Sequence, residues 1–167
     1  MLTFQRIRFV CLTALLCVNA SAADVGDTPP DDLGKFEGNR ILLSDNPGTV
    51  RIVTFWATWC PPCRKELPVL AQMQNNVGTE ELQVYAVNYK ESPRVVKKLR
   101  RQLPDTDVVF LSDRKGLVGE AYGVGGIPHM VIIGKDGKIA YRHVGYADSV
   151  IDRLIEELNT LLAAEGE

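Results

Sequence analysis

The sequence predicts an α/β fold in which helices flank a central mixed β-sheet. Runs of β-branched and aromatic residues alternate with helical stretches through the first part of the chain, which is typical of parallel strands joined by crossover helices. Two apolar runs near the C-terminus are separated by the turn residues Asp136 and Gly137, which indicates an antiparallel hairpin. Together these patterns predict a sheet that is parallel on one side and antiparallel on the other.

The parallel part follows a segment rich in turn residues, 24–39. Its expected elements are, in chain order, a strand over 50–57, a helix over 60–77, a strand over 82–89, a helix over 93–103 and a strand over 108–111. Pro68 lies inside the first helix and is expected to kink it. The βαβαβ order predicts right-handed crossovers between parallel strands.

The C-terminal part is expected to begin with a short helix over 115–122. The hairpin follows, with strands over 130–133 and 138–144. The last segment, 147–164, carries apolar residues at helical spacing, so it should form a helix that covers one face of the sheet.

The first 22 residues have the three parts of a secretory signal peptide. Arg6 and Arg8 form the basic region, 9–18 is apolar, and Ala20 and Ala22 mark a small-residue cleavage site. We therefore expect a signal peptide over 1–22, one domain over 23–167, and a location in the periplasm. The apolar run is short for a membrane span, although an uncleaved leader would act as an anchor.

The overall composition is that of an ordinary globular domain, with 46% hydrophobic residues and a net charge of −2. This charge gives no indication of nucleic-acid binding, which usually requires a basic excess. No stretch resembles a glycine-rich phosphate-binding loop, so no cofactor is expected. A monomer is expected.

Cys60 and Cys63 are the most informative residues. They are separated by Pro61 and Pro62, a spacing that places both thiols on one helical turn and lets them form a disulfide. A zinc site is the alternative, but it requires two further ligands. The remaining candidates are His129, His143, Cys11 and Cys17. A redox dithiol is favoured, because both other cysteines lie in the leader and a disulfide that closes so short a loop would add little stability.

The position of this pair assigns different roles to the two sulfurs. Cys60 at a helix N-terminus would form a stabilised thiolate and attack, and Cys63, one turn further and more buried, would resolve the mixed disulfide. Pro61 suits the first helical position. Because neither proline has an N–H, we expect a moderate lowering of the Cys60 pKa, sustained mainly by the N–H of Cys63.

These motifs resemble thioredoxin, and in particular the exported TlpA/ResA/DsbE-type thiol-disulfide oxidoreductases. The resemblance covers about residues 25–162 and rests on the run from Phe55 to Arg64, on 123–128 with its Ile-Pro pair, and on Asp136-Gly137. It implies a thioredoxin fold. It also implies that the Ile127–Pro128 bond is cis and that the backbone of Ile127 contacts substrate.

The resemblance assigns three further site residues. Trp59 would form part of an apolar docking surface. Thioredoxin has a buried Asp where this chain has Thr54, and in the exported subfamily a Glu after the next strand takes over proton transfer, which corresponds to Glu91. A carboxyl group close to the sulfurs would have a raised pKa. His129 stands where the family more often has Thr, and is expected to contact substrate or to lie near Cys60.

The resulting functional prediction is a thiol-disulfide oxidoreductase that reduces disulfides of exported proteins, in cytochrome c or copper-site maturation. A membrane thiol-disulfide reductase would supply its electrons. Two alternatives stay open at this stage: a disulfide-forming oxidase, because the fold alone does not fix the direction of electron flow, and a copper chaperone that uses Cys60, Cys63 and His129.

Overall fold

The computed structural model describes residues 23–102, 106–145 and 148–164. Its centre is a five-stranded sheet in the order β5-β4-β3-β6-β7. The strands are β3 (Val50–Trp56), β4 (Leu82–Tyr89), β5 (Val109–Asp113), β6 (His129–Ile133) and β7 (Ile139–Val144). β3, β4 and β5 are parallel, whereas β6 is antiparallel to both of its neighbours. The predicted mixed sheet is confirmed.

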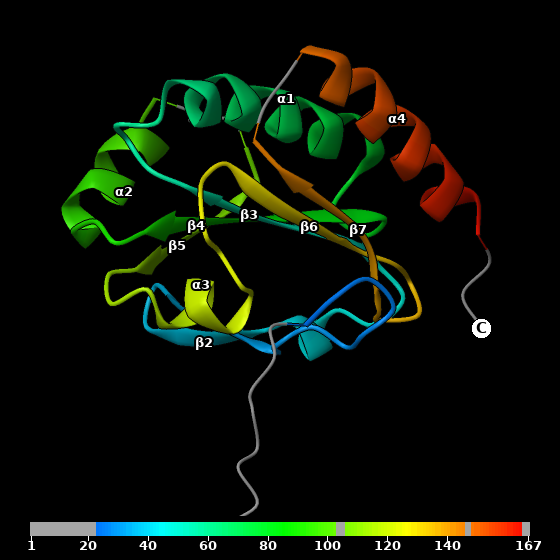
Figure 1. Ribbon diagram of the computed structural model, residues 1–167, viewed down its shortest axis with the longest axis horizontal. Helices are drawn as coiled ribbons and strands as arrows, with labels where there is room; N and C mark the ends of the chain where they lie inside the picture. Colours follow the sequence, from blue (N-terminus) through cyan, green and yellow to red (C-terminus); the bar gives the residue numbers. More distant parts are fainter. Residues whose placement is uncertain (1–22, 103–105, 146–147, 165–167) are drawn as a thin grey trace, which may run out of the picture.

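Helices cover both faces of this sheet (Figure 1). α1 (Pro61–Val77), α2 (Pro93–Arg100) and α4 (Asp148–Ala163) contribute to the core on one face. The other face carries α3 (Leu117–Ala121) and a two-stranded hairpin, β1 (Asp32–Phe36) and β2 (Asn39–Leu42), followed by the short helix η1 (Leu43–Asp45). The predicted helices are confirmed, each with a boundary shift of up to three residues. α1 runs through Pro68 without interruption.

The alternation of β3 side chains divides the interior into two cores. Ile52 and Trp56 face α1 and α4, whereas Val53 and Phe55 face α3 and β1. All seven residues of β3 are buried, because this strand is the middle strand of the sheet and lies between the two cores. The segment that follows β3 is therefore held at its start by a buried strand, and this segment leads into the cysteine motif.

The β1–β2 hairpin was not predicted from the sequence. Its turn residues are Glu37 and Gly38, and both have a positive φ, 51° and 92°. A two-residue turn of this kind normally carries Asn-Gly or Asp-Gly, so the usual sequence signal is absent.

The predicted leader, residues 1–22, lies outside the described residues. Within the described ranges, no helix is long and apolar enough to cross a membrane.

Candidate redox site

Cys60 and Cys63 are joined by a disulfide at the N-terminus of α1. The S–S distance is 2.06 Å and the two Cα atoms are 5.3 Å apart. Cys60 is the N-cap residue and Pro61 occupies the first helical position, as predicted. The buried strand β3 ends four residues earlier, so the motif sits at the carboxyl edge of the parallel strands.

The Sγ atom of Cys60 accepts a hydrogen bond from the backbone N–H of Cys63 at 3.2 Å. Pro61 and Pro62 have no N–H that could add to it. A thiolate on Cys60 would therefore be stabilised by this donor and by the positive end of the helix dipole. The predicted N–H donor is present, and the moderate lowering of the Cys60 pKa stays a prediction for the reduced protein.

Both cysteines are buried in the disulfide form. Cys60 is 3% exposed and Cys63 is 0% exposed, so Cys63 is the more buried of the two and Cys60 is also shielded while the disulfide is closed. The half-buried side chain of Ile127 packs against the core to which both cysteines belong. Cys60 is still the outer sulfur, because it caps the helix while Cys63 lies inside the first turn.

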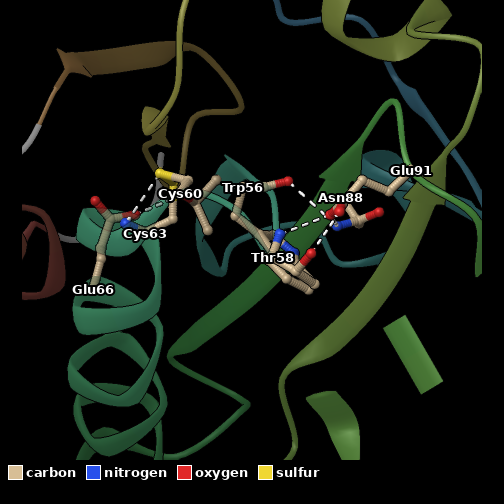
Figure 2. The surroundings of a disulfide bond; sticks show 8 residues. Trp56, Thr58, Cys60, Cys63, Glu66, Asn88 and Glu91 are labelled. Atoms are coloured by element: carbon tan, nitrogen blue, oxygen red, sulfur yellow. Dashed lines mark hydrogen bonds between the residues drawn. A yellow bond between two sulfur atoms is a disulfide. The ribbon is translucent and has the colours of Figure 1, made fainter. Parts of the chain in front are cut away.

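Glu66 is a site residue that the sequence analysis missed. It lies three residues after Cys63, hence on the same side of α1, and Figure 2 shows its carboxylate beside the disulfide. The side chain is buried, and its Oε1 accepts a hydrogen bond from the Thr54 hydroxyl at 2.7 Å. Thr54 stands where thioredoxin has its buried Asp. Through the hydrogen bond with Thr54, Glu66 therefore supplies a carboxylate to the same region of the fold. The apolar pattern of α1 was the available signal, because it places Glu66 on the buried face.

Burial raises the pKa of Glu66 to about 7, and the Thr54 hydrogen bond opposes this only in part. A carboxyl group with a pKa near neutrality can both accept and return a proton at physiological pH. Glu66 therefore has the position and the acidity of a proton carrier for the dithiol.

Glu91 does not have the environment that was predicted for it. Its carboxylate accepts three hydrogen bonds: from the Thr58 backbone N–H at 2.7 Å, from the Thr58 hydroxyl at 2.6 Å and from the Asn88 side-chain amide at 2.7 Å. Burial alone would raise its pKa, but these bonds together lower it. The expected raised pKa is wrong, and Figure 2 shows the carboxylate turned to Thr58 and Asn88. Glu91 holds the segment that leads into Trp59 and Cys60.

This arrangement gives different expectations for two substitutions of Glu91. Glu91→Gln keeps an acceptor and a donor of similar shape, so exchange activity should stay within about threefold of the unchanged protein. Glu91→Ala leaves the Thr58 N–H and the Asn88 amide without their partner, which should lower the free energy of unfolding by about 2 kcal/mol. Urea denaturation and peptide-disulfide reduction measure the two effects. A large loss of activity in Glu91→Gln with unchanged stability would contradict this expectation and support the predicted role of Glu91 in proton transfer.

Trp59, Ile127 and Pro128 are the other residues predicted to contact substrate. Trp59 directly precedes Cys60 and is 67% exposed, which is unusual for a tryptophan. The Ile127–Pro128 peptide bond is cis, as the resemblance implies. Ile127 packs against the cores on both faces of the sheet.

His129 does not join the site. On β6 it pairs with Phe55 and shares the face of α3 and β1, opposite to the face that carries the cysteines. It is 2% exposed, and its Nε2 atom lies 3.1 Å from the Arg142 guanidinium. Burial, together with the charge of Arg142, lowers the pKa of His129 to about 4. The predicted contact with substrate or Cys60 is therefore wrong, because alternation along β6 turns this side chain away.

The same geometry weighs against a copper site built from Cys60, Cys63 and His129. Among the described residues, no group of three or more His, Cys, Asp or Glu side chains is arranged to hold a metal ion. His143, the other histidine, hydrogen-bonds Glu157 of α4 at 2.6 Å and lies in the half-buried packing between β7 and α4.

Comparison with known proteins places the chain in a family. The Redoxin family matches residues 24–158. The chain belongs to this family.

Named relatives agree on the chemistry. The chain is 34% identical over 120 residues to the thiol-disulfide oxidoreductase ResA of Geobacillus thermodenitrificans, covering 71% of this chain and 68% of the relative. It is 35% identical over 132 residues to the thiol:disulfide interchange protein DsbE homolog of Paracoccus denitrificans, covering 75% and 70%.

A solved structure agrees on the fold. A putative thiol:disulfide interchange protein DsbE from Chlorobium tepidum superposes with a TM-score of 0.77 at 34% identity, covering 85% of this chain and 100% of that one. The predicted thioredoxin fold, the predicted family and the predicted activity class, thiol-disulfide oxidoreductase, are confirmed.

Proposed function

We propose that this protein reduces disulfides in other exported proteins and that Cys60 and Cys63 carry the two electrons. The observation that indicates the direction of electron transfer is the small number of hydrogen-bond donors to the Cys60 sulfur. Pro61 and Pro62 offer no N–H, which leaves the Cys63 N–H at 3.2 Å as the backbone donor described for its sulfur. A strong oxidant owes its potential to a stabilised thiolate in its reduced form. This dithiol has no donor from the two residues between its cysteines, so it should give up electrons more readily than such an oxidant.

Glu66 adds to the same tendency. A carboxylate beside the sulfurs repels a neighbouring thiolate and so disfavours the reduced, charged form. Its pKa of about 7 means that this effect is present above neutrality and is relieved when Glu66 is protonated.

The reaction has two steps. The Cys60 thiolate attacks one sulfur of the substrate disulfide, which forms a Cys60–substrate disulfide and releases the other substrate sulfur as a thiolate. The Cys63 thiol then transfers its proton to Glu66 and attacks Cys60 Sγ. The Cys60–Cys63 disulfide closes, and the second substrate sulfur leaves. The substrate gains two electrons and, from Glu66 and solvent, two protons.

The wider setting follows from the resemblance to exported oxidoreductases. The leader-like residues 1–22 support export or anchoring at the periplasmic side of a membrane. Cysteine pairs of proteins in cytochrome c or copper-site maturation are the proposed substrates, and a membrane thiol-disulfide reductase is the proposed electron donor. Glu91 positions the Thr58 segment, while Trp59 and Ile127 provide apolar contact surface.

The experiment is a single-turnover transfer. The protein is reduced, freed of reductant and mixed with a synthetic peptide that contains one disulfide. Mass spectrometry after alkylation then counts thiols on both molecules. We expect two thiols to appear on the peptide for each Cys60–Cys63 disulfide formed. A peptide that stays oxidised while the protein stays reduced would contradict the proposal.

A further inference from the structure

Exposed cations gather at the edge of the sheet that carries the disulfide. All of them lie in the segments that follow the carboxyl ends of β3, β4 and β5. They are Arg64, Lys65, Lys90, Arg94, Arg114 and Lys115. Each is exposed, and we call this set the cationic rim.

The parallel topology explains why the rim forms. The carboxyl ends of parallel strands meet at one edge, and neighbouring strands are about 4.8 Å apart. β5 is two strands from β3, so its end lies about 10 Å from the strand that leads to Cys60. A docking partner covers about 800 Å² on each side, a patch about 30 Å across, so one partner can reach from the disulfide to the ends of all three strands.

Acidic side chains at this edge balance only part of the rim. Glu66 and Asp113 are buried, and Asp113 accepts a hydrogen bond from the Gly119 N–H. Glu91 is engaged by Thr58 and Asn88, as Figure 2 shows. Glu120 is exposed, and its negative charge attracts the Lys90 ammonium group. Asp148, the first residue of α4, has a side chain outside the described set. Asp31 and Asp32 are exposed and line one hollow with Arg114 and Lys115, so they offset these two cations, although Asp32 also pairs with Arg40. The excess of positive charge therefore lies with Arg64, Lys65 and Arg94, in a chain whose net charge is −2.

The centre of the rim is apolar. Trp59 is 67% exposed, and Pro61, on the other side of Cys60 in sequence, is also exposed. An apolar centre with a charged border is the usual composition of a protein docking surface. The border then selects partners by charge and accelerates their encounter.

We propose that the cationic rim selects polypeptide partners whose cysteine pair is flanked by acidic residues. The inference rests on the proposed function and adds a partner class to it. A polypeptide is the favoured occupant because the rim lies at the same edge of the sheet as the sulfurs, which must reach a disulfide in the partner.

The test uses three synthetic peptides with the same disulfide loop, flanked by Asp, Asn or Lys. Each is mixed with the reduced protein at low and at 1 M ionic strength, and each rate constant is divided by that of the same peptide with dithiothreitol. At low salt we expect the Asp peptide to react about tenfold faster than the Asn peptide, and the Lys peptide about tenfold slower. At 1 M salt, where the screening length is about 3 Å, the rates should converge.

Two double variants locate the effect. Arg64→Glu with Lys65→Glu should remove or invert the preference. Lys97→Glu with Lys98→Glu makes the same charge change one helical turn beyond Arg94 and farther from the disulfide, and should weaken the preference less than the first variant does. Dividing each rate by that of the Asn peptide corrects for any change in the reactivity of Cys60.

The possible failures can be told apart. Equal rates for the Asp and Lys peptides at low salt, with normal reduction of the Asn peptide, would overturn the rim proposal and leave the function intact. No reduction of any peptide would instead overturn the proposed function. Equal peptide rates together with rim-dependent binding to phosphatidylglycerol vesicles would assign the rim to a membrane surface and likewise overturn the proposal.

Discussion

Replacing Cys60 by serine is expected to abolish disulfide exchange, whereas replacing Cys63 by serine should trap the protein in mixed disulfides. Cys60 is the helix cap and its sulfur receives the Cys63 N–H and the helix dipole, so it is the sulfur that ionises and attacks. Cys63 lies inside the first turn of α1 and is fully buried, so Cys60 is the outer sulfur that a partner meets first. Without Cys63, the first step still proceeds and the second cannot.

Non-reducing electrophoresis and mass spectrometry after reaction with a disulfide peptide measure both outcomes. Cys63→Ser should carry one covalently attached peptide that dithiothreitol releases, and Cys60→Ser should carry none. The double serine variant is the matched control for nonspecific labelling. Covalent peptide on Cys60→Ser, with none on Cys63→Ser, would reverse the assigned roles.

Glu66→Gln should slow the second step of exchange by about 100-fold at neutral pH, because a positioned proton acceptor typically contributes 10²-fold to 10⁴-fold. In the unchanged protein, the rate of this step should rise through the pKa of Glu66, about 7. That inflection should be absent from the variant, and the mixed disulfide should accumulate transiently. Rapid-quench alkylation over pH 5 to 9 follows both quantities.

Stability provides an independent readout of the same residue. The folded-state pKa of Glu66 is raised from 4.5 to about 7, so the folded protein holds a proton that the unfolded chain releases. Ionisation therefore destabilises the fold as pH rises from about 4.5 to 7, on the order of 3 kcal/mol in total. Glu66→Gln should remove this loss: its free energy of unfolding should exceed that of the unchanged protein at pH 8 and not at pH 4.

Glu80→Gln is the matched control, since Glu80 is exposed in the turn after α1. It should change neither the rate nor the pH dependence of stability. An unaltered second step in Glu66→Gln, with the expected change in stability, would leave Glu66 a buried carboxyl without a role in exchange.

Most of the fold could be predicted because its signals are local. The strands around Phe55 and Val87 are rich in β-branched and aromatic residues, and the helix start at Cys60 is marked by Pro61. The β1–β2 hairpin was not predicted because Glu37 has a positive φ, a conformation that glutamate rarely adopts and that the sequence therefore does not indicate.

The site was predicted less completely, because its chemistry depends on contacts between elements. The carboxylate of Glu91 is fixed by Thr58, 33 residues away in sequence, and that contact reverses its expected pKa shift. His129 was placed beside Cys60 by sequence proximity to Pro128, whereas the strand turns it to the opposite face. Glu66 was discoverable from its spacing to Cys63, but its acidity follows from burial, which spacing does not give.

The equilibrium reduction potential of the Cys60–Cys63 pair tests the central claim most directly. Equilibration of residues 23–167 with glutathione or dithiothreitol buffers, followed by alkylation, gives the fraction reduced. A reductant should have a potential near that of thioredoxin, about −270 mV, since Pro61 and Pro62 withhold thiolate stabilisation and Glu66 opposes it. A potential near about −120 mV, typical of a strong oxidant, would contradict the account and assign the protein to disulfide formation.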